Sequence, residues 1–371
     1  MVTPASGKAC SVGAGSSSGV ASCVAAGVVA TGDERTSSSP AGSWPPLSPH
    51  AASVSARAHN ARPRARGRAS TRCHSSRTGY GRIACARAQG NTKSCDTGTG
   101  AEYRTATVRL FATLVVLGFR RWSTYRLATA AGAFTNTVFG LIKASITVGA
   151  IGAAGGTLAG YDALAGATYA WVVQALVAPV NVFHWNELAL RIRDGDIAVD
   201  LARPLDPQFA HLAGFLGRAV HQFIPRGAPP LLAGALITGL ALPTSPLPYL
   251  LGLVSVVLAV SVSFATWWLV NLAAFWLIEL RGLLTLHIVG MSVLSGLVIP
   301  VHWFPDWLAT LAALTPFPSI LQAPVDVITG RVEGTAALGV LAVQAAWLAG
   351  VLLLGRLVFA RGARKLVVQG G

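Results

Sequence analysis

The chain is predicted to be an all-α membrane protein that crosses the bilayer several times. Of its 371 residues, 53% are hydrophobic and 12% are charged, whereas soluble chains carry about 25% charged residues. The last two-thirds hold five apolar stretches without Asp, Glu, Lys or Arg, and Lys and Arg fall almost entirely on alternate sides of them. About 20 helical residues cross a bilayer core roughly 30 Å thick, and helices satisfy the backbone internally.

The first hundred residues differ from the rest. Residues 1–100 hold 12 Lys/Arg against 3 Asp/Glu, are rich in Ser, Ala, Gly and Arg, and contain few large apolar side chains. Such a segment cannot bury enough surface to offset its ordering entropy. We therefore expect a disordered extension at 1–100 ahead of a membrane domain at 101–371. The extension is expected to be dispensable for function or to result from a misassigned start codon. A nucleic-acid-binding arm, a lipid-surface arm and a signal peptide are less favoured. All five cysteines lie here, at spacings that match no zinc pattern.

Tyr103–Tyr125 is predicted to form an amphipathic helix at the cytosolic face. Apolar residues recur at helical spacing, and arginines supply a basic face. These are Val108, Phe111, Ala112, Val115 and Phe119, with Arg104, Arg109, Arg120, Arg121 and Arg126. The alternative is that the helix continues directly into the first span, but five arginines argue against immersion in lipid.

The first span falls within Leu127–Tyr161, which has one charge, Lys143. This lysine either snorkels toward the cytosolic end at little cost or has a buried role in a pore or subunit seam. Gly152–Gly160 is expected to form an outer loop. The later spans are predicted at Leu164–His184, Gly227–Leu242, Tyr249–Trp276, Leu283–Ile299 and Gly334–Gly355.

The number of spans follows from the position of the basic residues. The amphipathic helix and the C-terminal tail are both basic, so both termini are expected in the cytosol, which requires an even number of spans. Val301–Glu333 contains a single Lys/Arg, Arg331, as an outer segment should. We therefore expect Val301–Val325, which contains several prolines, to dip into the membrane and return. The predicted fold is a cytosolic amphipathic helix plus six transmembrane helices, with a re-entrant outer segment before the last span.

Sequence motifs for nucleotide or metal chemistry are absent. No G-x-x-x-x-G-K-[ST] loop, His-Glu-x-x-His pair or Gly-x-Ser-x-Gly turn occurs, and no Asp/Glu–His constellation is seen within a span. We therefore expect that the chain is not an enzyme and that it binds neither a cofactor nor a metal ion. His287 is interpreted as a hydrogen-bonded core histidine rather than a proton relay. The energy for any transport must come from another subunit.

The loop Glu187–Asp206 is the candidate docking element. Leu188, Ile192 and Leu201 are expected to anchor it, Gly195 permits a sharp turn, and Arg203-Pro204 favours an extended end. A mixed-charge knob of this kind suits the groove of a soluble partner, although it would also fit a solvated loop without a role. The candidate contact residues are Glu187, Arg191, Arg193, Asp194, Gly195, Asp196, Asp200 and Arg203.

Several segments, in order over Tyr103–Gly371, resemble recurring stretches of one family. They are TNTVFGLIK (135–143), AGYD (159–162), IRDGDIAVDLARPLD (192–206), NLAAFWLIELRG (271–282), LSGLVIPVHWFPDWL (294–308), PFPSILQAPVDVITG (316–330) and ARKLVVQGG (363–371). Each alone is weak, but their order is a strong signal. The chain thereby resembles the membrane permease subunits of type-2 ABC exporters, whereas residues 1–100 have no counterpart.

The resemblance implies a mechanism. Two permeases, identical or homologous, would pair in the plasma membrane, and two ATPase subunits would dock below and bind the ATP. Their closure would push on Arg191–Arg203, open a path between the permeases for an apolar or amphipathic substrate, and use Asp306–Pro324 to line the outer exit. Glu279 and Arg281 would add a smaller contact, unless they are only an interfacial charge pair. The alternative is an ion-coupled secondary transporter acting without an ATPase.

Overall fold

A computed structural model describes residues 100–183 and 185–365, with side chains from Thr107 onward. These residues belong to one compact unit of the chain, Lys93–Gly371. The predicted N-terminal extension therefore lies outside the described residues. Regular secondary structure in the described part is helical, apart from an isolated β-bridge between Leu158 and Tyr161.

The helices follow one another in the order α1 (Gly100–Ser123), α2 (Arg126–Ala153), α3 (Ala163–Val180), α4 (Glu187–Arg193), α5 (Ile197–Ala202), α6 (Pro207–Gln222), η1 (Phe223–Gly227), α7 (Ala228–Ile237), α8 (Leu247–Asn271), η2 (Leu272–Phe275), α9 (Arg281–Leu294), η3 (Val301–Trp303), α10 (Asp306–Ala313), η4 (Phe317–Ser319), α11 (Gln322–Ile328) and α12 (Gly334–Ala363). Here η1 is a π-helical turn and the other η elements are 3-10 turns.

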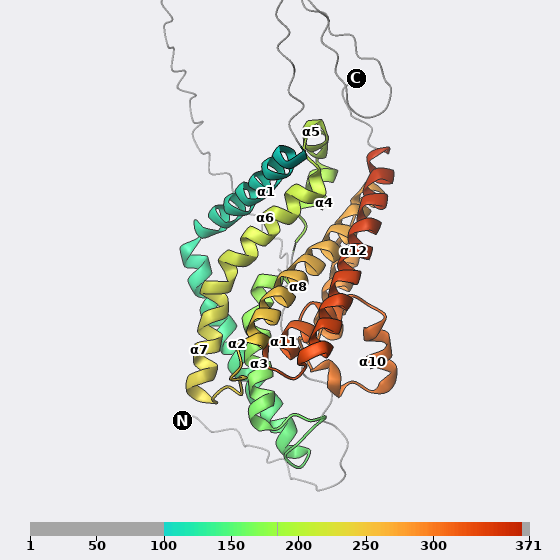
Figure 1. Cartoon of the computed structure of the whole chain (residues 1–371). Coiled ribbons are helices and arrows are strands. Elements are labelled where there is room, and N and C mark those ends of the chain that lie inside the picture. The colour runs from blue at the N-terminus through green and yellow to red at the C-terminus, as the bar shows by residue number, and fades with distance from the viewer. Residues whose placement is uncertain (1–99, 184, 366–371) are drawn as a thin grey trace, which may run out of the picture. The chain divides into compact units, whose positions relative to one another are not determined.

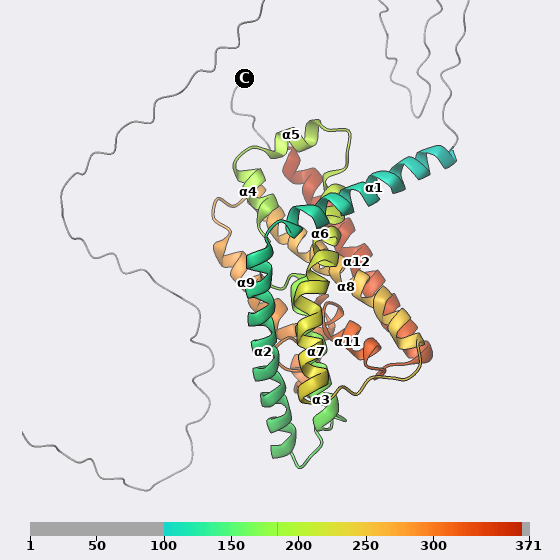
Figure 2. The ribbon, with the colours of Figure 1, turned by 90° about the vertical axis from the view of Figure 1, so that its left-hand side faces the viewer.

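The helices of this unit run between two ends (Figures 1 and 2). One, called the α4 end, holds α1, α4, α5 and the last turns of α12, and the other, called the α10 end, holds α10 and the α2–α3 connection. Contacts agree with this arrangement. At the α4 end Arg121 pairs with Glu187 at 2.9 Å. At the α10 end Arg331, from the α11–α12 connection, donates to the Ala159 carbonyl at 2.7 Å.

Helix α3 forms the centre of the bundle. Its 18 residues carry no charge, and 14 of them are buried, as expected of a helix that is apolar on all sides. The Asp162 carboxylate caps the first turn by accepting from the Ala165 N–H at 2.7 Å. Asn181 ends the helix in the left-handed conformation, with φ +57°. Helices α2, α6, α7, α8 and α11 all contact α3.

Four helical segments are long and apolar enough to cross a membrane: Arg126–Ala153, Ala163–Val180, Leu247–Phe275 and Gly334–Ala363. They correspond to the predicted first, second, fourth and sixth spans. The second ends at Val180 rather than continuing to His184, because the turn at Asn181 stops it. A fifth span is counted if the bent pair Asp306–Ala313 and Phe317–Ile328 is taken as one.

The other two predicted spans differ from the expectation. Helix α7 has 10 residues and ends at Ile237, and α9 has 14 residues. Helix α7 continues a longer helical path, because α6, η1 and α7 follow one another without a break. Arg218 and Arg226 lower the hydropathy of the first part of this path. Helix α9 ends at Leu294 just before Gly296, which adopts φ +87°. The sequence periodicity did not reveal that turn.

The bent pair before α12 has the features of a re-entrant segment. Its halves meet at 74°, and Pro316 and Pro318 lie at the break, where proline removes backbone donors and interrupts the helix. Helix α11 is mostly buried against α8. Helix α10 instead exposes Trp307 by 69%, and Leu314 beyond its end by 71%.

Large apolar side chains cover the outward faces of the bundle. Leu127 and Phe134 of α2 are 86% and 72% exposed, and Leu236 of α7 is 86% exposed. Such side chains also stand outward on α8 and α12. Soluble monomers rarely expose contiguous apolar surface on this scale. The surface of the described residues is therefore suited to lipid.

Helix α1 packs closely on α6. A β-carbon at Gly217 would lie 2.0 Å from the Val115 carbonyl oxygen, and one at Gly118 would lie 2.5 Å from the Gly214 carbonyl oxygen. The rings of Phe111 and Phe209 meet at 4.9 Å. Part of the apolar face predicted for Tyr103–Tyr125 is thus covered by protein.

Substituting Gly217 with valine should separate α1 from α6, because its side chain would occupy the space of a backbone carbonyl. We expect a destabilisation of about 1–3 kcal/mol, measured as a lower thermal unfolding midpoint in detergent. Gly214→Ala is the matched control, since a β-carbon there meets nothing within 4 Å. Equal midpoints for Gly217→Val and Gly214→Ala would contradict the close approach.

Candidate functional site

The predicted docking loop is built from two short helices, α4 and α5, at the α4 end (Figure 1). Asp194, Gly195 and Asp196 turn the chain between them, and Gly195 has φ +83°. This is the left-handed region, so the sharp turn predicted there is confirmed. Arg203 is extended before Pro204, with φ −81° and ψ 142°, also as predicted.

Three apolar side chains fix this segment to the bundle. Leu188 and Ile197 are fully buried, and Ile192 is 7% exposed. Leu201, predicted as an anchor, is 42% exposed, so that prediction is wrong. Only the first turn of α5 reaches the core, and a rise of about 6 Å over four residues carries Leu201 beyond it. Ile197, which the sequence did not single out, takes its place.

A buried asparagine ties α4 to α8. The Asn271 side chain is fully buried. Its amide oxygen accepts from the Ala189 N–H at 3.0 Å, and its amide nitrogen donates to the Trp185 carbonyl at 2.9 Å. One side chain therefore satisfies a donor in α4 and an acceptor before it. The structure thus gives a structural role to Asn271, the first residue of the NLAAFWLIELRG stretch, to which the sequence had assigned none.

An arginine–carboxylate pair clamps α4 onto α5. The Arg191 guanidinium donates to both oxygens of Asp200, at 2.7 and 2.9 Å, and these hydrogen bonds raise the pKa of Arg191. Arg203 lies 3.5 Å from the same carboxylate. Bidentate pairs are stronger and more directional than single contacts. The exposed Arg121–Glu187 pair links α1 to α4 but contributes little energy.

The tip of the segment faces outward. Arg193, Asp194, Gly195 and Asp196 are exposed, and the three charged ones form no ion pair among the described residues. Exposed apolar side chains lie on the same two helices: Leu190, Val199 and Leu201. The segment thus presents unpaired charges and apolar groups on a braced support.

The second predicted contact, Glu279 and Arg281, is also exposed. The Glu279 carboxylate accepts from the Arg281 backbone N–H at 2.9 Å, at the start of α9. Among the described residues these two side chains form no ion pair, which does not support the alternative of a charge pair. Helix α4 packs on η2, which places both candidate contacts at the same end.

A polar cluster that the sequence did not reveal lies toward the α10 end. The Asp326 carboxylate contacts the His302 Nε2 at 2.9 Å and accepts from the Gln322 amide at 2.9 Å. The Tyr169 hydroxyl lies 2.8 Å from the Gln322 oxygen and 2.7 Å from the Gly296 carbonyl. A β-carbon at Gly296 would lie 2.5 Å from that hydroxyl, so only glycine fits.

Tyr161 closes this cluster from the α2–α3 connection. Burial, together with the nearby Asp326 carboxylate, raises the pKa of Tyr161, so its phenol stays neutral. The Arg331 guanidinium lies 4.0 Å above its ring. The histidine and the carboxylate come from different elements, His302 from η3 and Asp326 from α11, so no pattern within a single span reveals the pair. The available sequence signal was the presence of His302 in the stretch 294–308 and of Gln322 and Asp326 in the stretch 316–330.

The structure bears on two titratable residues of the spans: it excludes one of the two alternatives for Lys143, and it places His287 in the core as expected but without the expected hydrogen bond at Nε2. The Lys143 ammonium donates to the Leu297 carbonyl and lies 5.6 Å from the centre of the Tyr169 ring. It therefore does not snorkel toward the α4 end. His287 is buried and meets the Trp267 ring at 4.5 Å. Its Nε2 has no hydrogen-bond partner among the described residues. The predicted hydrogen bond is therefore not found at that nitrogen.

The described residues contain no group of three or more His, Cys, Asp or Glu side chains suited to a metal ion.

Comparison with known proteins decides the family. A family model described as ABC-2 family transporter protein matches residues 142–370. The chain belongs to the ABC-2 transporter family. This ABC-2 permease is a multi-pass membrane component of a transporter, and family membership implies partnership with an ABC ATPase subunit. The match begins inside α2 and includes the α4–α5 segment and the polar cluster. No curated protein and no solved structure matches the chain.

Substituting Asn271 with alanine should loosen α4. The change leaves the Ala189 N–H and the Trp185 carbonyl unpaired, and each unpaired buried group costs about 1–3 kcal/mol. We expect faster hydrogen exchange in α4 and a lower unfolding midpoint. Asn186→Ala is the control, because the Asn186 side chain makes no capping bond to α4. Unchanged exchange in Asn271→Ala would show that the asparagine does not hold α4 in place.

Proposed function

We propose that this ABC-2 permease is the translocation subunit of an ATP-driven exporter and that the α4–α5 segment receives the ATPase subunit. The observation that carries the proposal is the combination of an exposed, unpaired tip with a buried base. Arg193, Asp194 and Asp196 are available to a partner, whereas Asn271 and the Arg191–Asp200 pair hold the helices beneath them. A partner pushing on this tip would move a rigid element rather than a loop.

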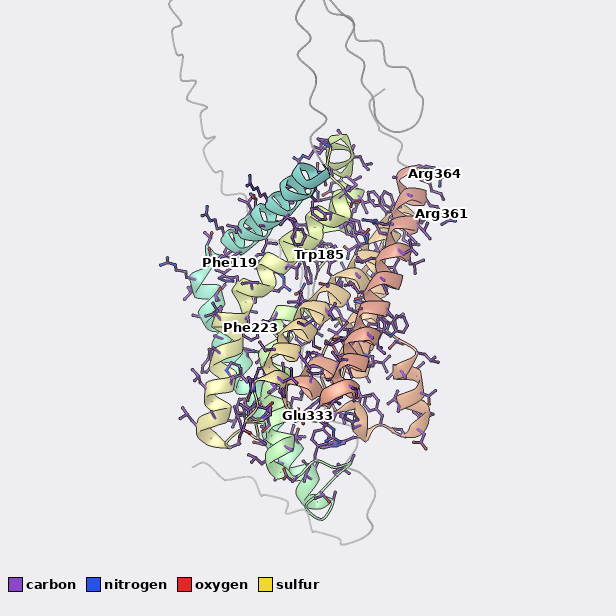
Figure 3. All side chains as sticks on the ribbon, viewed as in Figure 1. Phe119, Trp185, Phe223, Glu333, Arg361 and Arg364 are labelled. Carbon is purple, nitrogen blue, oxygen red and sulfur yellow. The ribbon has the colours of Figure 1, made fainter. Side chains whose placement is uncertain are left out.

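The distribution of basic residues supports a cytosolic α4 end. Arg361 and Arg364 lie at the end of α12 near that end, and Glu333 lies at the start of α12 on the other side (Figure 3). Helix α1 adds Arg109, Arg120 and Arg121. Among the described residues, Arg331 is the arginine found in the connections at the α10 end. Lys and Arg favour the cytosolic side, and both termini would then be cytosolic.

The alternation of the helices between the two ends supports six passes. These would be α2, α3, the continuous path α6–η1–α7, α8, α9 and α12, with α10–α11 re-entrant on the outer side. Helices shorter than a full span are workable in lipid where neighbouring protein covers their ends. Helix α9 ends against such cover, since Gln322 donates its backbone N–H to the Ser295 carbonyl at 3.0 Å.

Force applied at the tip has two routes into the membrane part. Asn271 connects α4 to the end of α8, and α8 packs against both α11 and α12. The Arg121–Glu187 contact connects α4 to α1, which packs along α6. A movement of α4 and α5 would thus reach α8 and α11, and with them the polar cluster near the outer side.

The outer segment would line the exit between two paired permeases, either identical or homologous. The exposed apolar faces of α2 and α10 suit an apolar or amphipathic substrate in a lipid setting. Hydrolysis would take place in the ATPase subunit, which binds the ATP. The plasma membrane, with the α4 end in the cytosol, is the location that fits an exporter.

The Asp326–His302 pair favours a second candidate, an ion-coupled transporter acting without an ATPase. A buried carboxylate beside an imidazole can bind and release a proton. Transport by the purified chain in vesicles that hold a proton gradient and no nucleotide would support this alternative. Transport that requires both the ATPase subunit and ATP would support the exporter.

The double variant Asp194→Ala, Asp196→Ala should lose the ATPase subunit while still inserting in the membrane. Both carboxylates are exposed and unpaired within the described residues, so their removal leaves the bundle intact. We expect co-purification of the ATPase subunit in mild detergent to fall about tenfold, which corresponds to ~1.4 kcal/mol, together with loss of export. Glu333→Gln, an exposed carboxylate at the other end, is the control. An unaffected export rate in the double variant would remove the segment from the mechanism.

The proposed orientation is tested with single cysteines. The native cysteines all lie within residues 1–100 and are first replaced by serine. An impermeant maleimide should label Ala154→Cys, in the α2–α3 connection, on intact cells. It should label Asp194→Cys only after the cells are permeabilised. The reverse pattern would invert the topology and place the ATPase contact elsewhere.

A further inference from the structure

Two adjoining cavities open at the α4 end between α1, α6 and the α4–α5 segment. Their volumes are about 300 and 360 Å³, and the smaller one is called the inner groove. Both are lined by the same six residues, Arg121, Trp122, Trp185, Glu187, Arg191 and Arg218. The cavity of about 360 Å³ also reaches Asp194 and Asp196 of the exposed tip, whereas the inner groove does not.

The cavity of about 300 Å³ carries an excess of positive charge. Arg121, Arg191, Arg203 and Arg218 line it, against the carboxylates of Glu187 and Asp200. Both carboxylates already contact arginines, since Glu187 pairs with Arg121 and Asp200 pairs with Arg191 and Arg203. No acidic partner within the cavity remains for Arg218.

Arg218 is the unusual member of this set because it is 6% exposed. Its terminal nitrogens donate to the Ala178 and Pro179 carbonyls at 3.0 and 2.9 Å, at the end of α3. Its Nε has no hydrogen-bond partner among the described residues. A helix C-terminus offers about half a negative charge, whereas buried charges are normally paired in full. An anion is the ligand that would complete this environment.

The surroundings of the groove indicate where that anion comes from. Trp122 is 40% exposed and Trp185 is half-buried, and tryptophan is enriched at the headgroup level of membranes. Helix α2 begins four residues after Trp122 with Leu127 almost fully exposed, so the lipid surface starts beside the groove. Guanidinium groups match phosphate geometry well.

We propose that the inner groove binds the phosphate headgroup of an anionic phospholipid from the cytosolic leaflet. Arg218 lies at its base, and the more exposed Arg121 and Arg203 lie at its mouth, with side chains 67% and 64% exposed. The assignment of leaflet rests on the proposed orientation. A lipid held there would contact α1, α4 and α6 together, so its presence would stiffen the support of the ATPase contact.

The test uses the full chain in nanodiscs of phosphatidylglycerol or phosphatidylcholine, with native mass spectrometry to count the lipids retained on release. We expect more retained phosphatidylglycerol than phosphatidylcholine. Arg218→Gln and Arg121→Gln should each lower phosphatidylglycerol retention about tenfold. Arg364→Gln, an exposed arginine at the same end just after α12, should leave it unchanged. Arg121→Gln keeps the test decisive if the buried substitution prevents folding, because Arg121 is exposed.

Three outcomes would overturn the proposal. Equal retention in the arginine variants and in the native chain would place the lipid elsewhere. Displacement of the lipid by millimolar inorganic phosphate alone would show a site for free anions rather than a headgroup. Displacement by the ATPase subunit would show that an acidic side chain of the partner is the true occupant.

Failure of this proposal is separable from failure of the proposed function. Cysteine labelling reports the orientation without any lipid measurement. Co-purification of the ATPase subunit with the Arg218→Gln and Arg121→Gln variants reports docking. Docking preserved with lipid retention lost would confirm two distinct sites, whereas lipid retained with docking absent in the native chain would overturn the exporter mechanism alone.

Discussion

Lipid offers the backbone no hydrogen-bond partner, and most features of this permease follow from that constraint. Backbone groups must be bonded within helices or covered by protein. The fully helical, charge-free α3 stands at the centre, and α11, within the irregular segment between α9 and α12, is packed against α8. There, Gln322 serves the backbone directly, since its oxygen accepts from the Val301 N–H at 2.9 Å.

The same constraint explains where the polar side chains of the membrane part are used. Several of them end on backbone carbonyls at the termini of helices or in breaks: Asn136 on Arg226, Lys143 on Leu297, Arg218 on Ala178 and Pro179, and Asn271 on Trp185. Helix ends have carbonyls without intrahelical partners. A polar side chain and an unpaired carbonyl are each unfavourable in lipid, and the hydrogen bond between them satisfies both. The same bond joins elements that are distant in the chain.

These cross-links also connect the proposed docking segment with the α10 end. The segment is short and partly exposed, yet its base reaches α8 through one asparagine, and α8 packs against α11, which holds Asp326. The inner groove lies between this base and α1, so a headgroup bound there would act on the support and not on the contact surface. Nucleotide-driven movement and lipid composition could then bear on the same two helices.

The sequence by itself determined the class of the protein, four of its spans, the sharp turn at Gly195 and the extended residue before Pro204, because these depend on hydropathy, charge and local backbone preference. Tertiary structure decided the rest. Leu201 turns outward while Ile197 turns in, α9 stops before Gly296, Lys143 reaches Leu297, and Asp326 meets His302 across 24 residues. Each of these depends on contacts between distant segments, which periodicity along one helix does not contain.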